Sequence, residues 1–199
     1  MGETIYTNKR NETRGRIDSV YIEQLRANVG TNLTVKAICE RAGINRSTFY
    51  SYYNDTVDMR KQIEDRLVSQ FKERMAPVAA QHLDDPDRIL FEIMEYNREN
   101  GFLPLLLIAA GSSDFVYRIS EAATTMLADA HTLTDDDREK ITMLFTYHFA
   151  GISMVMRQMK EASLPSDEAY ENMVMKLANL LLPVARGGLL PAIKSYIKS

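Results

Sequence analysis

The sequence predicts an all-α fold, and three observations support this prediction. Apolar residues recur at intervals of three and four along most of the chain, as they do on the buried face of an α-helix. No segment shows the alternation of apolar and polar residues that indicates a strand. Only nine glycines and six prolines interrupt the 199 residues. Helix-capping residues recur between the apolar segments and divide the chain into about ten predicted helices.

Composition limits the class of protein. Hydrophobic residues make up 45% of the chain and charged residues 26%, which are ordinary globular values. The one cysteine, Cys39, excludes an internal disulfide, and we expect it to be a small buried hydrophobe. No signal peptide is apparent, and the longest apolar run, 102–110, is far shorter than the roughly 20 residues that cross a bilayer. We therefore expect a cytoplasmic protein with no membrane partner.

Charge is unevenly distributed along the chain. The net charge is −3, but the segment from Lys9 to Arg46 holds eight basic and four acidic residues. That segment therefore carries +4, and the remainder carries −7. A basic N-terminal part on an acidic body suits a modular nucleic-acid binder, although a solvated basic face would have the same composition.

The first part of the chain is expected to begin loosely and then to form a helix. Residues 1–13 are polar, and terminal polar residues are often loose. From Arg16, apolar residues recur at helical spacing as far as Val29, and Gly30 is placed to end that helix.

Two short helices and a long one are predicted next. Thr34 is the expected N-cap of the first, which ends at a turn over 42–44. Asn45 is the expected N-cap of a second helix over 46–52. A long connecting helix follows, over residues 57–76.

The second part of the chain is expected to be helical throughout. Asp85-Pro86 is a cap followed by a proline in the first turn, and Thr134 precedes three aspartates that suit the positive end of a helix. Breaks are expected at Gly101, at Pro165-Ser166 and at Gly187-Gly188. The helices of this part are expected to begin at Asp85, Phe102, Ser113 or Asp114, Thr134 and Ser166, and a last one to span 190–197.

Residues 33–60 have the outline of a helix-turn-helix. Such a motif needs a small residue where its helices cross, a turn residue that tolerates left-handed backbone angles, and apolar residues that fix the crossing. Ala37 supplies the first, Gly43 the second, and Ile38, Ile44 and Phe49 the third. The helix over 46–52 would then be the element that enters the major groove of double-stranded DNA.

The predicted recognition helix is rich in groups that donate hydrogen bonds to phosphates and base edges. Simpler interpretations stay open: Arg46 as a solvated helix-start residue, Ser47 and Thr48 as caps, and one tyrosine, for which we favour Tyr53, as a packing residue. The predicted DNA-binding residues are Thr34, Lys36, Asn45, Arg46, Ser47, Thr48, Tyr50 and Tyr52.

This segment resembles the DNA-binding domain of the TetR (AcrR) family of bacterial regulators. The resemblance rests on Thr34-Val35, Ile38-Cys39, Ala42-Gly43-Ile44-Asn45, Thr48-Phe49-Tyr50 and Tyr52-Tyr53 at the family's spacing. It implies an N-terminal three-helix domain over 1–56 and a larger helical domain over 57–199 that binds an effector and dimerises. It also implies a homodimeric regulator on a palindromic operator, most often a repressor that its ligand releases.

Two residues depart from the family's pattern. Ser47 stands where the family often has glycine, and Thr56 stands where it commonly has a lysine that contacts phosphate. Without that charge we expect a weaker or less salt-dependent contact at Thr56. This keeps open an alternative, in which the chain is a helical co-regulator that binds a ligand or a protein and has lost specific DNA binding.

The predicted effector site lies in the helical body, and its effector is an unknown small molecule. Methionine-rich helix faces favour an apolar effector. His148 lies on an apolar stripe. We expect it to be either a histidine of the core or a contact of the effector. The candidate effector-binding residues are Phe91, Met94, Tyr117, Met126, Phe145 and His148.

Catalytic and metal-binding roles are not expected. The three histidines are far apart, and no two share metal-ligand spacing on one helix. The chain has no phosphate-binding loop, dinucleotide fingerprint or nucleophile elbow. We therefore predict no enzymatic activity, no cofactor and no metal.

Overall fold

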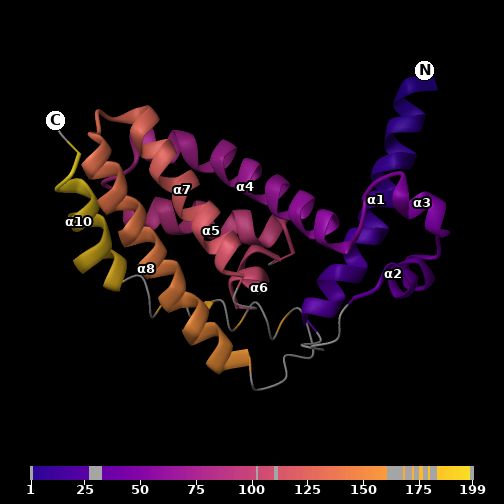
Figure 1. The fold of residues 1–199 in the computed structure, drawn as a ribbon. Helices are drawn as coiled ribbons and strands as arrows, with labels where there is room; N and C mark the ends of the chain where they lie inside the picture. The colour runs from indigo at the N-terminus through magenta and orange to yellow at the C-terminus, as the bar shows by residue number, and fades with distance from the viewer. Residues whose placement is uncertain are drawn as a thin grey trace. The chain divides into compact units, whose positions relative to one another are not determined.

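The computed structural model describes residues 2–26, 33–101, 103–109, 112–160 and 183–197, together with positions 168, 172, 175, 176 and 179. Over these residues the secondary structure is helical and contains no strand, which confirms the all-α prediction (Figure 1). The chain divides into two compact units, Met1–Arg66 and Leu67–Ser199. None of the described helices is both long enough and apolar enough to cross a membrane.

The first unit contains helices α1 (Gly2–Arg26), α2 (Val35–Ala42) and α3 (Arg46–Tyr50), and the start of α4 (Thr56–Gln81). Helix α1 packs on α2, and α2 packs on α3. Each helix buries apolar side chains in a shared core, and burial of such side chains is the main force that holds so small a unit together. The most deeply buried of them are Ile17, Val20, Ile38, Phe49, Met59 and Ile63.

Three boundaries in this part of the chain differ from the predictions. Helix α1 begins at Gly2, so the expectation of a loose segment over 1–13 was wrong. That segment has no apolar stripe to signal a helix, but it also has no proline, so a helix nucleated further along extends back through it. The predicted end at Gly30 lies outside the described residues.

Helix α3 ends at Tyr50 and not at Tyr52, because the chain tightens there and the Tyr52 amide donates to the Phe49 carbonyl at 2.9 Å. Helix α4 continues to Gln81, past the predicted end at residue 76. Pro77 lies inside it, and the burial of Val78 and Ala79 just beyond holds the helix in spite of the lost amide donor.

The second unit contains α5 (Pro86–Glu99), α6 (Leu103–Ala109), α7 (Ser113–Ala130) and α8 (Asp135–Lys160). Helices α6, α7 and α8 pack against one another, and α5 contacts α6 (Figure 1). The predicted caps are present. Asp85 Oδ1 accepts from the Arg88 amide at 3.0 Å, and Thr134 Oγ1 accepts from the Asp137 amide at 3.1 Å.

The chain near its C-terminus differs from the prediction. Gly187-Gly188 does not break the helix, because both glycines lie in a π-helical turn, η1 (Ala185–Leu189), that leads directly into α10 (Leu190–Lys194). Helix α10 is shorter than the predicted 190–197. The predicted break at Pro165-Ser166 and most of the helix predicted to begin at Ser166 lie outside the described residues.

Candidate functional site

The turn between α2 and α3 has the geometry that the sequence predicts. Gly43 adopts the left-handed conformation, with φ of 62°, and its amide donates to the Cys39 carbonyl. Because a side chain with a Cβ is strained there, glycine fits this position best. Thr34 Oγ1 accepts from the Ala37 amide at 3.2 Å, and Asn45 Oδ1 accepts from the Thr48 amide at 2.7 Å. Both helices therefore begin at firm caps.

Helix α3 has a buried side and an exposed side. Phe49 is fully buried, whereas Tyr50 leaves 55% of its surface exposed, and the two rings meet edge to face. Tyr53, just beyond the helix, is buried as predicted. This arrangement anchors α3 through Phe49 and leaves its other face free to contact a partner.

The predicted DNA-binding residues lie mostly on the exposed surface of the first unit. Thr48 and Tyr52 are half-buried. Ser47 Oγ donates to Asn45 Oδ1 at 2.7 Å, so both side chains already take part in the cap of α3. Lys36 forms an ion pair with Glu40 on the surface of α2. The exposed members of the set are Thr34, Lys36, Asn45, Arg46, Ser47 and Tyr50.

Two arginines of α1 approach the predicted site. The guanidinium carbons of Arg10 and Arg14 lie 5.7 and 5.9 Å from the centroid of the Tyr52 ring, which is the geometry of a cation–π contact. The sequence shows that this segment is basic but does not pair these arginines with a tyrosine more than thirty-five residues away. They add positive charge beside α3.

Thr56 is the first residue of α4, and a carboxylate caps this helix start. Asp55 Oδ1 accepts from the amides of Val57 and Asp58 at 2.8 and 2.7 Å. Asp58 Oδ2 accepts from the Asn54 amide, and this hydrogen bond lowers the pKa of the Asp58 carboxyl. The start of α4 therefore carries carboxylates and a neutral Thr56.

A network of polar side chains joins α1 to α4 within the first unit. Tyr53 Oη donates to Asp18 Oδ1 at 2.7 Å, and Arg66 Nη2 donates to Asp18 Oδ2 at 2.5 Å. Burial raises the pKa of Asp18, and the Tyr53 hydrogen bond and the Arg66 charge offset part of that rise. Burial and the nearby Asp18 raise the pKa of Tyr53. Asp18 is thus the shared acceptor that joins Tyr53, beyond α3, and Arg66 of α4 to α1.

The second unit contains a partly open cavity of about 190 Å³. Its walls come from α4 to α8 and from the η1–α10 segment, and none of the described lining residues is charged. Met94, Phe145 and His148 line it. Of the other candidates, Phe91 and Tyr117 are exposed, Met126 is buried elsewhere, and none of the three is among the lining residues. The lining also includes Phe71, Ile89, Ile93, Asn97, Leu105, Ile108, Phe115, Phe149 and Ile152.

Three polar residues interrupt the apolar lining. Tyr96 Oη donates to the Leu67 carbonyl at 2.9 Å, and its ring meets Phe71 at a centroid distance of 5.4 Å. Burial lowers the pKa of His148 below its ordinary value, so the imidazole is neutral at neutral pH. Asn97, the third, is 3% exposed. The cavity can therefore hold an uncharged, mostly apolar molecule.

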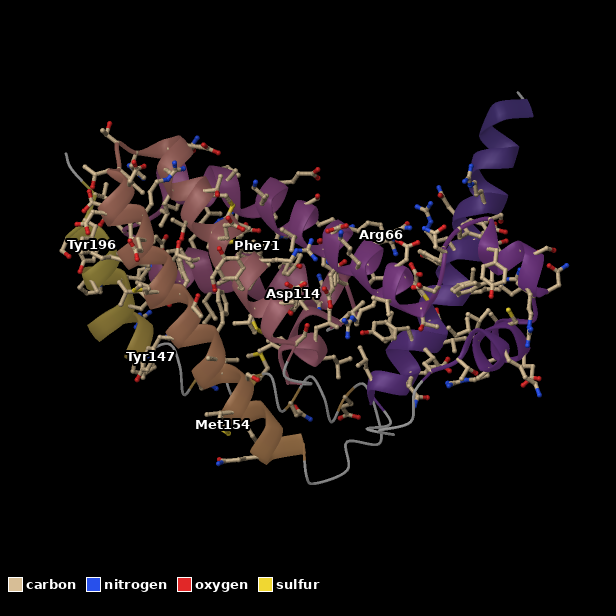
Figure 2. All side chains as sticks on the ribbon, in the orientation of Figure 1. Arg66, Phe71, Asp114, Tyr147, Met154 and Tyr196 are labelled. Carbon is tan, nitrogen blue, oxygen red and sulfur yellow. The ribbon has the colours of Figure 1, made fainter. Side chains whose placement is uncertain are left out.

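Helix α8 also exposes an apolar stripe. Met143, Tyr147 and Met154 are 60%, 81% and 58% exposed and recur at helical spacing. Figure 2 shows Tyr147 and Met154 projecting from the same side of α8. Phe145, His148 and Ile152, which line the cavity, occupy the opposite side of the helix by their spacing. The stripe, defined by Met143, Tyr147 and Met154, is suited to contact another protein surface.

No group of histidine, cysteine and acidic side chains in the described parts of the chain could hold a metal ion. Comparison with models of known protein families gives no match, and neither does comparison with the sequences of curated proteins. Among solved structures, the dihydroxyacetone kinase operon activator DhaS is similar, with a TM-score of 0.51 at 15% identity. The similarity covers 94% of this chain and 98% of that one, and it shows a common fold.

Proposed function

We propose that this chain is a sequence-specific DNA-binding transcriptional regulator that acts as a homodimer and responds to a small-molecule effector. One observation carries the proposal. Helix α3 is fixed to its core by the buried Phe49, is capped by Asn45, and exposes Arg46, Ser47 and Tyr50 together. A short helix held in this way fits the major groove, where guanidinium and hydroxyl groups read base edges.

The surroundings of α3 support the same function. Arg10 and Arg14 lie beside it on Tyr52, and the segment from Lys9 to Arg46 carries a net +4. This charge suits a phosphate backbone, while the acidic remainder limits non-specific binding. The resemblance of residues 33–60 to the TetR (AcrR) family and the fold shared with an operon activator add support. The mode that we propose for this chain is that of a repressor that its ligand releases from DNA.

The exposed stripe on α8 supports a homodimer. A surface with Met143, Tyr147 and Met154 exposed is unfavourable in water and becomes favourable when a second copy covers it. A dimer contact through this helix would place two α3 helices in one assembly. A palindromic operator then follows, because a two-fold dimer reads two equivalent half-sites.

Helix α4 is the proposed connection between effector and DNA. Its first turns supply Met59 and Ile63 to the core of the first unit, and further along it supplies Phe71 to the cavity lining. A ligand that moves Phe71 would act on the helix that begins beside α3. The DNA affinity would fall by the coupling free energy, for which ~1–3 kcal/mol is typical.

Selection from random duplex DNA tests the proposal. The purified chain is incubated at low salt with duplexes that carry a randomised segment, and bound duplexes are amplified. We expect a palindrome with half-site centres about 34–36 Å apart and binding that weakens as salt rises. Tyr50→Ala should weaken binding to the selected site while the dimer stays intact. Tyr117→Ala is the matched control, because Tyr117 is 53% exposed but lies in the second unit.

The alternative function is a helical co-regulator that binds a ligand or protein and no specific DNA. The neutral Thr56 and the carboxylates of Asp55 and Asp58 at the start of α4 favour this alternative, because they offer a phosphate no positive charge. No enrichment at low salt, with a dimer that still binds ligand, would support the co-regulator and overturn the DNA-binding proposal.

A further inference from the structure

The arginines of the first unit whose side chains the structure describes are of two kinds. Those of the first kind pair with a carboxylate, and they are Arg41, Arg60 and Arg66. Those of the second kind form no ion pair among the described residues, and they are Arg10, Arg14, Arg16 and Arg46. A cation that has no partner in its own chain is available to an anion from outside.

The unpaired arginines lie on or beside α3, and Arg46 is its first residue. Arg10 and Arg14 are four residues apart on α1, and their guanidinium carbons lie 5.7 and 5.9 Å from the ring centroid of Tyr52, two residues beyond α3. Arg16 Nη1 lies 4.0 Å from the position that a Cβ on Gly43 would occupy, at the turn before α3. Helix α1 therefore places unpaired positive charge at both ends of α3.

No group in the described part of the chain neutralises the pair of arginines on Tyr52. Arg10 and Arg14 carry like charges one helical turn apart, and such charges repel each other. The charge of Arg14 lowers the pKa of Asp18 against the larger rise that burial causes, but Asp18 already accepts from Tyr53 and Arg66. An anion that contacts both guanidinium groups would remove this repulsion.

Both guanidinium groups can be reached from solvent. Arg10 is exposed, and of the Arg14 nitrogens only Nε is both buried and without a hydrogen-bond partner, so the terminal nitrogens of Arg14 stay open to a partner. Terminal guanidinium nitrogens match the oxygens of a phosphate and bind them through paired hydrogen bonds. Because Tyr52 follows α3 so closely, a phosphate held there would belong to the duplex that α3 reads.

We propose that α1 is a second DNA-contacting element, in which Arg10 and Arg14 bind backbone phosphates of the operator and the ring of Tyr52 holds both guanidinium groups in place. This inference rests on the proposed function, because the phosphates are those of the same duplex. It also supplies the charge that Thr56 lacks. Thr56 follows Tyr52 by four residues and stands where the TetR (AcrR) family commonly has a phosphate-binding lysine.

The experiment measures the affinity of the full chain for DNA by fluorescence anisotropy at several salt concentrations. It uses both the selected site and a duplex of mixed sequence. Each phosphate contact contributes about 0.9 to the slope of log affinity against log salt. We expect Arg10→Gln and Arg14→Gln each to make that slope shallower by about one unit. Each should also weaken both duplexes by the same factor, roughly fivefold to tenfold at about 0.1 M salt, because phosphates carry no sequence information.

Arg41→Gln is the matched control. It removes the same charge from an arginine of the same unit, but Arg41 already pairs with Glu23 at 2.8 Å. We expect Arg41→Gln to retain the wild-type slope. An equal change in Arg41→Gln and Arg10→Gln would show that net charge sets the slope, and it would overturn the contact through α1.

Two variants of Tyr52 test its role as a positioning residue. Tyr52→Phe keeps the ring on which the guanidinium groups lie, so the slope should stay at the wild-type value even if the lost hydroxyl lowers the affinity. Tyr52→Leu removes the ring, and we expect a shallower slope. A partly unfolded sample binds less DNA but retains the slope, so the slope separates this role from a loss of structure. A wild-type slope in Tyr52→Leu would overturn the role of the ring.

Failure of this inference can be told from failure of the proposed function. If Arg10→Gln and Arg14→Gln both retain the wild-type slope on a selected site, the contact through α1 is excluded and the regulator stands. If the slopes change as expected on mixed-sequence DNA but no site is ever selected, the contact stands and sequence-specific regulation fails. If the wild-type chain binds no duplex at low salt, both proposals are overturned.

Discussion

Arg66 of α4 donates a hydrogen bond to Asp18 of α1, with 2.5 Å between Nη2 and Oδ2. Arg66 is labelled in Figure 2. The same half-buried carboxylate accepts from Tyr53, so one acceptor joins both the chain just beyond α3 and helix α4 to α1. The orientation of α3 therefore depends on a residue that precedes the helix-turn-helix in the sequence.

Removal of this acceptor should destabilise the first unit. Asp18→Ala leaves the Tyr53 hydroxyl without a partner and the Arg66 guanidinium without its carboxylate, so we expect a loss of about 1–3 kcal/mol in the free energy of unfolding. Tyr53→Phe removes one of the two hydrogen bonds and should cost about 0.5–1.5 kcal/mol. Chemical denaturation followed by circular dichroism measures both. A larger loss in Tyr53→Phe than in Asp18→Ala would contradict this network.

A positive charge at position 56 should strengthen DNA binding. Thr56→Lys places an ammonium at the start of α4, where it can reach a phosphate. We expect tighter binding to a selected site at low salt, and a plot of log affinity against log salt that steepens by about one unit of slope. Thr56→Gln is the uncharged control. If both variants give the wild-type slope, Thr56 does not face the DNA backbone.

Stability should depend on the protonation of His148. Burial lowers the pKa of this imidazole from 6.5, so the unfolded chain takes up the proton at a higher pH than the folded chain does. The stability that His148 contributes is therefore present above pH 6.5 and is lost as the pH falls through the folded pKa. We expect wild-type protein to lose more free energy of unfolding than His148→Gln between about pH 7.5 and about pH 5.5.

A matched control separates this effect from the general response to acid. His82→Gln removes an exposed histidine instead and is the control for the loss of an imidazole as such. Parallel stability curves for wild type and His148→Gln over that range would show that His148 protonates equally in the folded and unfolded chains.

The apolar stripe on α8 should form the dimer. Tyr147→Glu buries a carboxylate in the proposed contact, and we expect the dimer dissociation constant to rise by more than about tenfold. Tyr117→Glu introduces the same charge at an exposed tyrosine of α7 and should leave the dimer unchanged. Analytical ultracentrifugation at micromolar concentration measures both. An unchanged sedimentation coefficient in Tyr147→Glu would show that the stripe on α8 does not form a dimer contact.

The local structure of the helix-turn-helix could be predicted from the sequence, because residues close to one another in the chain determine it. Thr34 and Asn45 cap helices through amides three residues away, and Gly43 turns the chain through its own backbone angles. The helical start of α1 could not be predicted by periodicity, because its polar residues form no apolar stripe. The continuation of α4 to Gln81 was also missed, because burial of Val78 and Ala79 beyond Pro77 depends on tertiary packing.

The candidate cavity was only partly predictable. Met94, Phe145 and His148 lie on recognisable apolar faces, and the structure places all three in the lining. Phe91 and Tyr117 lie on the same helices as cavity residues, but their exposure depends on which helices pack against them. Asn97 Oδ1 has no hydrogen-bond partner among the described residues, and no local sequence pattern predicts this, because it depends on tertiary packing. The DNA contacts themselves stay predictions until DNA is bound.

Photo-cross-linking from α3 tests the reading of DNA most directly. Ser47 is exposed on α3, and a benzophenone side chain in its place reacts with whatever lies within a few ångströms. On a selected duplex we expect two clusters of cross-linked bases in the major groove, with centres about 34–36 Å apart along the DNA axis. The same group at Tyr117 should give none. Cross-links from Ser47 that reach only protein, or a single cluster of bases, would contradict a dimer that reads DNA through α3.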